Sequence, residues 1–146
     1  MNNRVFVSTP ISGFSDEREY NKYRDEVIKF ISFLRNNGFD VCAEIEKVYG
    51  VNDYDSPSKS VEMDFARIKD CDYFILLHPK RIQSSSLIEC GYACALDKKI
   101  VAVGKRNDFP YLIIGYEEFS DKAKNIEVQE LSDEVYPHIL NILKSL

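Results

Sequence analysis

The sequence predicts an α/β protein built on a mostly parallel sheet, and three observations support this prediction. Short apolar runs rich in β-branched and aromatic residues alternate with longer segments in which apolar residues recur every three or four positions. Within the short runs apolar and polar residues do not alternate, which is typical of strands buried on both faces. The joints between segments are short, so we expect helices to connect parallel strands as right-handed crossovers.

The first part of the chain predicts a strand, a helix and a second strand. Residues 4–8 are the first apolar run, and residues 16–37 have helical spacing. Gly38 is expected to end this helix, and residues 39–45 are expected to form the second strand. Residues 46–58 then make a long polar loop; loops of this length in compact domains are usually functional or mobile, so it is a candidate substrate lid.

The next segment predicts a helix that runs to about Cys71. Ser56 and Pro57 supply its N-cap and its first-turn proline. Asp64 is expected beside the buried stripe, because it lies three or four positions from stripe residues. The stripe itself consists of three apolar residues: Val61, Phe65 and Ile68.

The rest of the chain continues the alternation. Residues 72–77 predict a buried strand, residues 86–97 a helix and residues 100–103 a further strand. Residues 111–114 are expected to form a short strand or a buried coil, and residues 125–128 an edge strand. A closing amphipathic helix is marked by Leu131, Val135, Ile139, Ile142 and Leu146.

These elements predict one domain over residues 1–146, with a doubly wound, mostly parallel sheet of the flavodoxin-like or Rossmann-like kind and helices on both faces. A chain of 146 residues can bury an ordinary core without a metal or disulfides. Ligands of such sheets bind beyond the carboxyl ends of the strands. The expected ends are at residues 8–13, 45–49, 78–86 and 104–107.

Composition and charge narrow the function classes. The apolar share of 45% and the charged share of 29% are typical of a globular protein. A net charge of −5 argues against nucleic acid or an anionic membrane as a partner. No stretch reaches the ~20 apolar residues of a membrane span, and the first residues do not resemble a secretory signal. We therefore expect a cytoplasmic protein that binds small molecules or proteins.

The cysteines and histidines give weak signals for chemistry. The cysteines contain no C-x-x-C pair, so we expect buried thiols in a reducing compartment: Cys42, Cys71, Cys90 and Cys94. Cys90 and Cys94 have helical spacing, but no histidine lies near them in the sequence to complete a metal site. His78 is either an acid/base candidate or a plain strand-end residue. No metal or cofactor is expected.

Glu89 is the only charged residue between Ser86 and Leu96. A carboxylate in apolar surroundings is costly unless something uses it. In one interpretation Ser86 is the N-cap, and Glu89 closes a capping box by accepting a hydrogen bond from the Ser86 backbone. In the other, Glu89 faces a cleft at the start of the helix and acts on a substrate. Its position one turn past a strand end favours the second interpretation.

Three serines precede Glu89, at Ser84, Ser85 and Ser86. The dinucleotide motif G-x-G-x-x-G, the P-loop motif and the hydrolase motif G-x-S-x-G are all missing from the sequence. The serine hydroxyls and the helix N–H groups behind them can receive a phosphate or sugar oxygen. The alternative is that these serines only cap the helix.

Three blocks resemble a known enzyme family. They are Val5 to Pro10, Asp64 to Ile68 with Cys71 to Tyr73, and Ser86 to Ala93 with Lys98 to Val101. They resemble the nucleoside 2-deoxyribosyltransferase superfamily, and Glu-x-Gly-Tyr-Ala is the most specific part. Members cleave the N-glycosidic bond of nucleosides or nucleoside monophosphates and usually form dimers or larger oligomers.

The resemblance implies that Glu89 is the nucleophile or stabilises an oxocarbenium ion, and that Asp64 is the acid on the base side. The alternative for Asp64 is an exposed helix residue or a loop cap. The implied partner is a nucleoside or nucleotide, and a homo-oligomer is expected. Family members that act on free nucleosides often have an acidic residue where this chain has Gln83. The expected substrate-binding residues are Ser8, Ser12, Gln83, Ser84, Ser85 and Ser86.

Two alternatives remain open. Bacterial TIR domains cleave the nicotinamide bond of NAD and often make signalling nucleotides in antiphage defence. Residues 6–8 and the serine-to-glutamate helix start also resemble that pattern, and NAD is itself an N-riboside. The other alternative is a nucleotide sensor or interaction module that keeps the fold without turnover.

Overall fold

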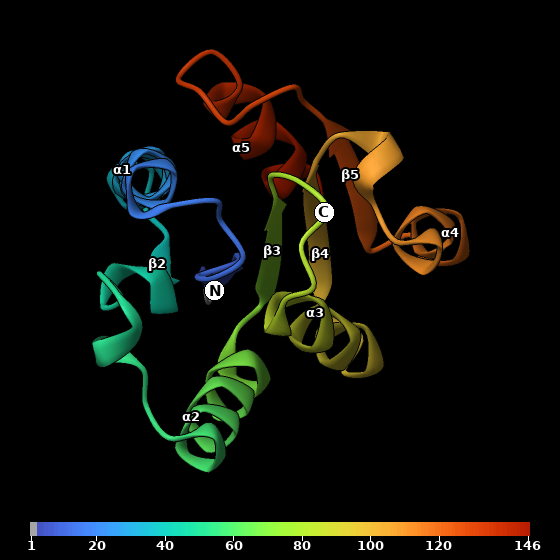
Figure 1. Cartoon of the computed structure of the whole chain (residues 1–146). Helices are drawn as coiled ribbons and strands as arrows, with labels where there is room; N and C mark the ends of the chain where they lie inside the picture. Colours follow the sequence, from blue (N-terminus) through green and yellow to red (C-terminus); the bar gives the residue numbers. More distant parts are fainter. Residues whose placement is uncertain (1–2) are drawn as a thin grey trace.

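The computed structural model describes residues 3–146 and contains a five-stranded sheet between layers of helices (Figure 1). The strand order is β2-β1-β3-β4-β5, and every neighbouring pair is parallel. The predicted doubly wound α/β fold is therefore confirmed. The strands are β1 (Arg4–Ser8), β2 (Asp40–Cys42), β3 (Tyr73–His78), β4 (Lys99–Gly104) and β5 (Ala123–Glu127).

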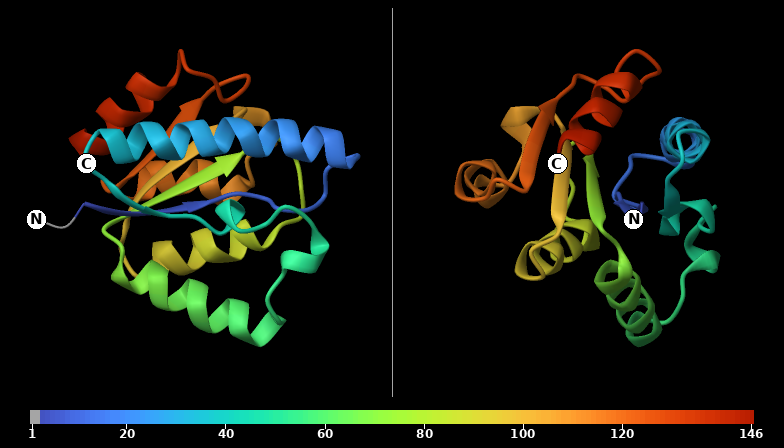
Figure 2. Two further views of the ribbon diagram at one scale, coloured as in Figure 1. Left: turned by 90° about the vertical axis from the view of Figure 1, so that its left-hand side faces the viewer. Right: turned by 180° about the vertical axis from the view of Figure 1, so that it is seen from behind.

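Helices α1 and α5 cover one face of the sheet, α2 and α3 cover the other, and α4 lies beside β5 (Figure 1 and Figure 2). Within residues 3–146, none of the helices combines the length and apolar character needed to cross a bilayer. The α-helices are α1 (Glu17–Asn36), α2 (Pro57–Asp70), α3 (Ser85–Ala95), α4 (Tyr111–Phe119) and α5 (Tyr136–Ser145). Three short 3-10 turns are η1 (Glu44–Glu46), η2 (Val51–Asp53) and η3 (Arg106–Asp108).

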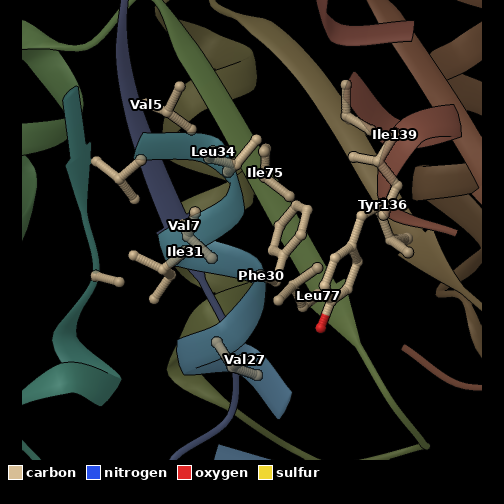
Figure 3. Close-up of a cluster of buried hydrophobic side chains, with 14 of the residues drawn as sticks. Val5, Val7, Val27, Phe30, Ile31, Leu34, Ile75, Leu77, Tyr136 and Ile139 are labelled. Carbon is tan, nitrogen blue, oxygen red and sulfur yellow. The ribbon is translucent and has the colours of Figure 1, made fainter. Parts of the chain in front are cut away.

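Each face of the sheet has its own apolar core, because successive strand residues point to opposite faces. In β1, Val5 and Val7 belong to the cluster under α1 and α5, whereas Phe6 belongs to the cluster under α2 and α3. Burial of each such side chain stabilises the fold by roughly 1.5–3 kcal/mol. Figure 3 shows part of the first cluster, with Val27, Phe30, Ile31 and Leu34 of α1 beside Ile75, Leu77, Tyr136 and Ile139.

The ends of the first two helices agree with the sequence. Asp16 caps α1 by accepting a hydrogen bond from the Glu19 backbone at 2.8 Å. Gly38 has a φ of +90° just after α1, a conformation that glycine adopts without strain. Ser56 caps α2, and Pro57 occupies its first turn.

The second strand is shorter than predicted. Strand β2 ends at Cys42, and the chain turns at once into η1. The guanidinium of Arg24 on α1 donates to the carbonyl of Ile45 at 3.0 Å and to that of Glu46 at 2.7 Å. Because a side chain satisfies these carbonyls, this segment needs no partner strand.

Three other predictions are wrong. The closing helix α5 begins at Tyr136, so Leu131 and Val135 lie before it. Residues 111–114 form the start of α4 and not a strand or coil. The helix was missed because apolar residues lie on all of its sides and hide the helical period. Tyr111, Leu112 and Phe119 are exposed on it. Val61 was expected in the buried stripe of α2, but its side chain is 54% exposed; it lines a cavity instead of the core.

The direction in which successive strands are added to the sheet reverses between β1 and β3. From β1 the chain moves outward to β2, and it then returns to the other side of β1 to form β3 and the remaining strands. In this strand order a crevice forms beyond the carboxyl ends of the two strands at the change of direction. Ser8 ends β1, and α3 follows β3, so both elements reach this crevice.

Candidate active site

A cavity of about 400 Å³ lies at the change of direction of the sheet. Its wall is formed by α2, the start of α3, the segment after β1 and the turn after β2. A cavity of this size can enclose a small ligand. Six of the predicted site residues line it: Ser12, Asp64, Ser84, Ser85, Ser86 and Glu89.

Glu89 does not close a capping box, so that interpretation is wrong. The N-cap of α3 is Ser84, whose hydroxyl accepts a hydrogen bond from the Ser86 backbone at 3.1 Å. The Glu89 carboxylate instead accepts a hydrogen bond from the Ser8 hydroxyl at 2.7 Å. Ser8 is buried at the end of β1, so this bond fixes Glu89 against the sheet while its side chain lines the cavity.

Asp64 and Glu89 form a carboxyl pair across the boundary between α2 and α3. Phe65 follows Asp64 in α2, and its ring stacks on Tyr92 of α3 with centroids 4.0 Å apart and planes 11° apart. This stack holds the two helices together beside the pair. The carboxyl groups of Asp64 and Glu89 lie close enough to interact, and a hydrogen bond between two carboxyl groups requires that one of them carries a proton.

Both members of the pair have a raised pKa. Burial raises the pKa of Glu89 to about 8, and the charge of Asp64 adds to this effect although the bond from Ser8 opposes it. Burial likewise raises the pKa of Asp64, and the charge of Glu44 adds to it. Two carboxyl groups in contact and partly removed from water cannot both ionise readily. The pair therefore holds one proton at neutral pH.

Glu44 is a third carboxylate on the cavity wall. It lies 3.4 Å from Nη1 of Arg67, and Asp64 lies 3.7 Å from the same nitrogen. Arg67 thus lies between the two carboxylates, and Lys47 adds a contact to Glu44 at 3.5 Å. The sequence did not single out Glu44, because the second strand was expected to run through it. The sequence signal for Glu44 as a site residue was its acidic side chain close to an expected strand end, where ligands bind in such sheets.

The predicted loop over residues 46–58 borders the cavity. The hydroxyl of Tyr54 donates to the carbonyl of Ile11 at 3.1 Å, and both residues line the cavity. This bond joins the loop after β2 to the segment after β1. Asp55 also lines the cavity, and its carboxylate lies 3.3 Å from Lys59.

Gln83 is not part of this cavity. It lines a separate hollow of about 360 Å³ near His78 and Phe109. Residues 81–84 are not helical, and successive side chains of an extended chain point to opposite sides. Ser84 faces the Glu89 cavity, and Gln83 faces away from it.

The other chemical candidates lie outside the Glu89 cavity. His78 is buried, its Nε2 is 2.9 Å from the carbonyl of Asp108, and its ring stacks on Phe109. Cys90 is buried on the inner side of α3. Among residues 3–146, no group of three or more histidine, cysteine and acidic side chains is arranged to hold a metal ion.

Comparisons with known proteins found matches among solved structures. No family model matches the sequence, and no curated protein matches it. Twenty-two solved chains match in structure. The CMP N-glycosidase BcmB of Clostridium botulinum is 25% identical over 94% of this chain and 98% of its own, with a TM-score of 0.68.

A second match shows the fold. The solution structure of BlsM is 18% identical, with a TM-score of 0.78 over 99% of this chain and 91% of its own. The likeness to BlsM, at 18% sequence identity, concerns the fold alone. The sequence identity to BcmB is higher, at 25%. Together with the three sequence blocks, these matches support the resemblance of the chain to the nucleoside 2-deoxyribosyltransferase superfamily.

Proposed function

We propose that this protein is an enzyme that cleaves the N-glycosidic bond of a nucleoside or nucleotide, with Glu89 as nucleophile and Asp64 as acid. The observation that carries this proposal is the proton-sharing pair of Asp64 and Glu89 on the wall of a cavity. Strongly shifted carboxyl groups in a cavity are typical of catalytic sites. The likeness to BcmB, a CMP N-glycosidase, supports the reaction class.

In the first step, the shared proton passes from Glu89 to Asp64, which leaves Glu89 as the carboxylate. Glu89 attacks C1′ of the sugar while the bond from C1′ to the base nitrogen breaks. The electron pair of the broken bond goes to the base, which takes the proton from Asp64. The products of this step are the free base and a glycosyl ester on Glu89.

In the second step, the acceptor is water or a second base. Asp64 is now a carboxylate and removes a proton from the acceptor as the acceptor attacks C1′. The bond between C1′ and Glu89 breaks, and its electron pair returns to the Glu89 carboxylate. The proton is again held by the pair, so the site is ready for another turnover.

The serines have two kinds of role in this proposal. Ser8 positions the catalytic carboxylate through its 2.7 Å bond to Glu89. Ser84 and Ser85 lie at the start of α3, where N–H groups and the helix dipole favour sugar or phosphate oxygens. Ser12 lines the cavity from the segment after β1. Gln83 has no role here, because it faces another hollow.

The test is a panel of ribonucleosides, deoxynucleosides, their monophosphates and NAD, incubated with the wild-type protein and analysed by chromatography. We expect free base from at least one nucleoside or monophosphate. Nicotinamide release from NAD alone would favour the TIR-like alternative. Calorimetric binding of a nucleotide without any released base would contradict the enzyme and favour the sensor.

A further inference from the structure

Glu44 is a carboxylate on the cavity wall that has no role in the proposed reaction. It follows β2 as the first residue of η1, and its side chain is 22% exposed. Its carboxylate lies 3.4 Å from Arg67 and 3.5 Å from Lys47. These two ion pairs hold the carboxylate in place. Glu44 therefore presents a fixed hydrogen-bond acceptor to the cavity.

The contacts along the wall give the order of the groups. Glu89 contacts Asp64, Asp64 contacts Arg67, and Arg67 contacts Glu44. In the proposed reaction C1′ lies against Glu89, and the leaving nitrogen of the base lies against Asp64. The sugar is then on the Glu89 side, and the base extends past Asp64 toward Glu44.

The surroundings of this part of the wall suit a flat ring. Phe65 lines the cavity next to Asp64, and its ring is fixed by its stack on Tyr92. Aromatic rings stack favourably on nucleobases. A base beside Asp64 therefore meets a fixed aromatic ring and, at its far edge, the carboxylate of Glu44.

An ionised carboxylate can only accept hydrogen bonds. The amino group of cytosine or adenine donates to such an acceptor, whereas uracil and hypoxanthine carry a carbonyl oxygen at the corresponding position. A base carbonyl facing Glu44 would place two hydrogen-bond acceptors opposite each other, with no donor between them. A site that hydrogen-bonds an amino group strongly rejects a base that has a carbonyl oxygen in its place.

We propose that Glu44 selects substrates whose base carries an exocyclic amino group, and that cytosine or adenine is therefore preferred over uracil or hypoxanthine. This inference rests on the proposed function for the placement of the base. Glu44 then recognises the edge of the base, and Arg67 and Lys47 hold the Glu44 carboxylate in position. Arg67 also contacts Asp64, so it connects base reading to the catalytic pair.

The test measures binding and turnover separately. Dissociation constants for cytidine, uridine, adenosine, inosine and their 5′-monophosphates are measured by calorimetry on the Glu89→Gln protein, in which turnover is blocked. We expect the amino-bearing member of each pair to bind about 10- to 100-fold more tightly. In the wild-type protein, kcat/KM for base release should show the same preference.

Substitution of Glu44 should remove the preference. In Glu44→Gln the side-chain amide can donate to a carbonyl oxygen, so the ratio within each pair should fall to about one. Glu46→Gln is the matched control, because Glu46 lies in the same turn but pairs with Arg35 at 2.8 Å; it should keep the wild-type ratio. If Glu44→Gln does not fold, Glu44→Asp retracts the carboxylate and should also reduce the ratio.

The outcomes separate the two proposals. Equal binding of the members of each pair, or binding of none of the compounds, overturns the role of Glu44. Selective binding that depends on Glu44, without release of base by the wild-type protein, supports that role and overturns the proposed reaction. Base release without any preference supports the reaction and overturns the role of Glu44.

Discussion

Glu19 and Glu89 lie at the same edge of the sheet but on opposite faces, and their surroundings differ. Glu19 is in α1 and lines a cavity of about 220 Å³, whereas Glu89 is in α3 and lines the cavity at the change of strand direction. Each accepts a hydrogen bond from a serine hydroxyl, Ser15 for Glu19 and Ser8 for Glu89. Only Glu19 has a cation beside it, since Lys80 donates to it at 2.5 Å.

The difference in charge partners gives the two glutamates opposite pKa shifts. The hydrogen bond from Lys80, followed by those from Ser15, lowers the pKa of Glu19 to about 2. Burial raises the pKa of Glu89 to about 8, and the charge of Asp64 adds to it. Glu19 is therefore a permanent carboxylate, while Glu89 can gain and lose a proton near neutral pH. Only Glu89 can therefore exchange a proton with a neighbouring carboxyl group near neutral pH, as the proposed mechanism requires.

The largest expected effect is that of Glu89→Gln. Removing the proposed nucleophile should lower kcat for base release by about 10³-fold or more, because an amide cannot form the glycosyl ester at C1′. Glu19→Gln is the control on the other face and should leave kcat within about twofold. Both rates are measured by chromatography on proteins whose circular dichroism matches the wild type. Equal losses in the two variants would remove the functional distinction between them.

Asp64→Asn should have the second largest effect. An amide cannot protonate the leaving base, so kcat should fall by about 10²-fold. The loss should be much smaller for 7-methylguanosine, whose positively charged base leaves without a proton. Glu62→Gln, in the same helix but exposed to solvent, is the control. An equal loss for charged and neutral bases would argue against Asp64 as the acid.

Ser8→Ala should have an intermediate effect. Without the 2.7 Å hydrogen bond, the carboxylate of Glu89 is less well oriented and its ionised form is less stable. We expect kcat/KM to fall by about 10-fold at pH 7 and the alkaline limb of the pH profile to move to higher pH. An alkaline limb that moved to lower pH would contradict the assigned role of this bond.

The smallest expected effect concerns stability. The pKa of Glu89 rises from an ordinary 4.5 to about 8 on folding, so the folded state holds a proton that the unfolded state loses between these values. The free energy of unfolding should therefore decrease as the pH rises through this window. Glu89→Gln should lack this decrease and be more stable than the wild type at pH 8 by about 1 to 2 kcal/mol in urea unfolding. The same slope in both proteins would show that Glu89 does not titrate in this range.

The sequence was sufficient to predict the sheet and part of the site. The apolar runs predict β1, β3 and β4, because their residues are buried on both faces and leave a clear pattern. Ligands bind beyond the strand ends in such sheets, so the sequence places Glu89 and Ser84 at the ligand crevice. The pairing of Asp64 with Glu89 was implied by the family resemblance.

The remaining features depend on contacts that a sequence does not contain. Beyond the early end of β2, Arg24 of α1 binds the carbonyls of Ile45 and Glu46, and Glu44 lies in the same turn on the cavity wall. Gln83 and Ser84 are adjacent in the chain but face different hollows. The apolar residues of α4 hide its helical period, because its outer side is as apolar as its inner side. In each case tertiary contacts decide the outcome.

The most direct measurement of the central claim is a carbon NMR titration of the Glu89 carboxyl group, read beside the pH dependence of kcat/KM. Because the catalytic pair must retain one proton, we predict a Glu89 titration midpoint near pH 8 and a tenfold loss of kcat/KM per pH unit above it. Asp64→Asn should lower the midpoint, since it removes a neighbouring negative charge. A midpoint near 4.5 in the wild type, with activity that does not fall above pH 8, would contradict the shared proton and the mechanism built on it.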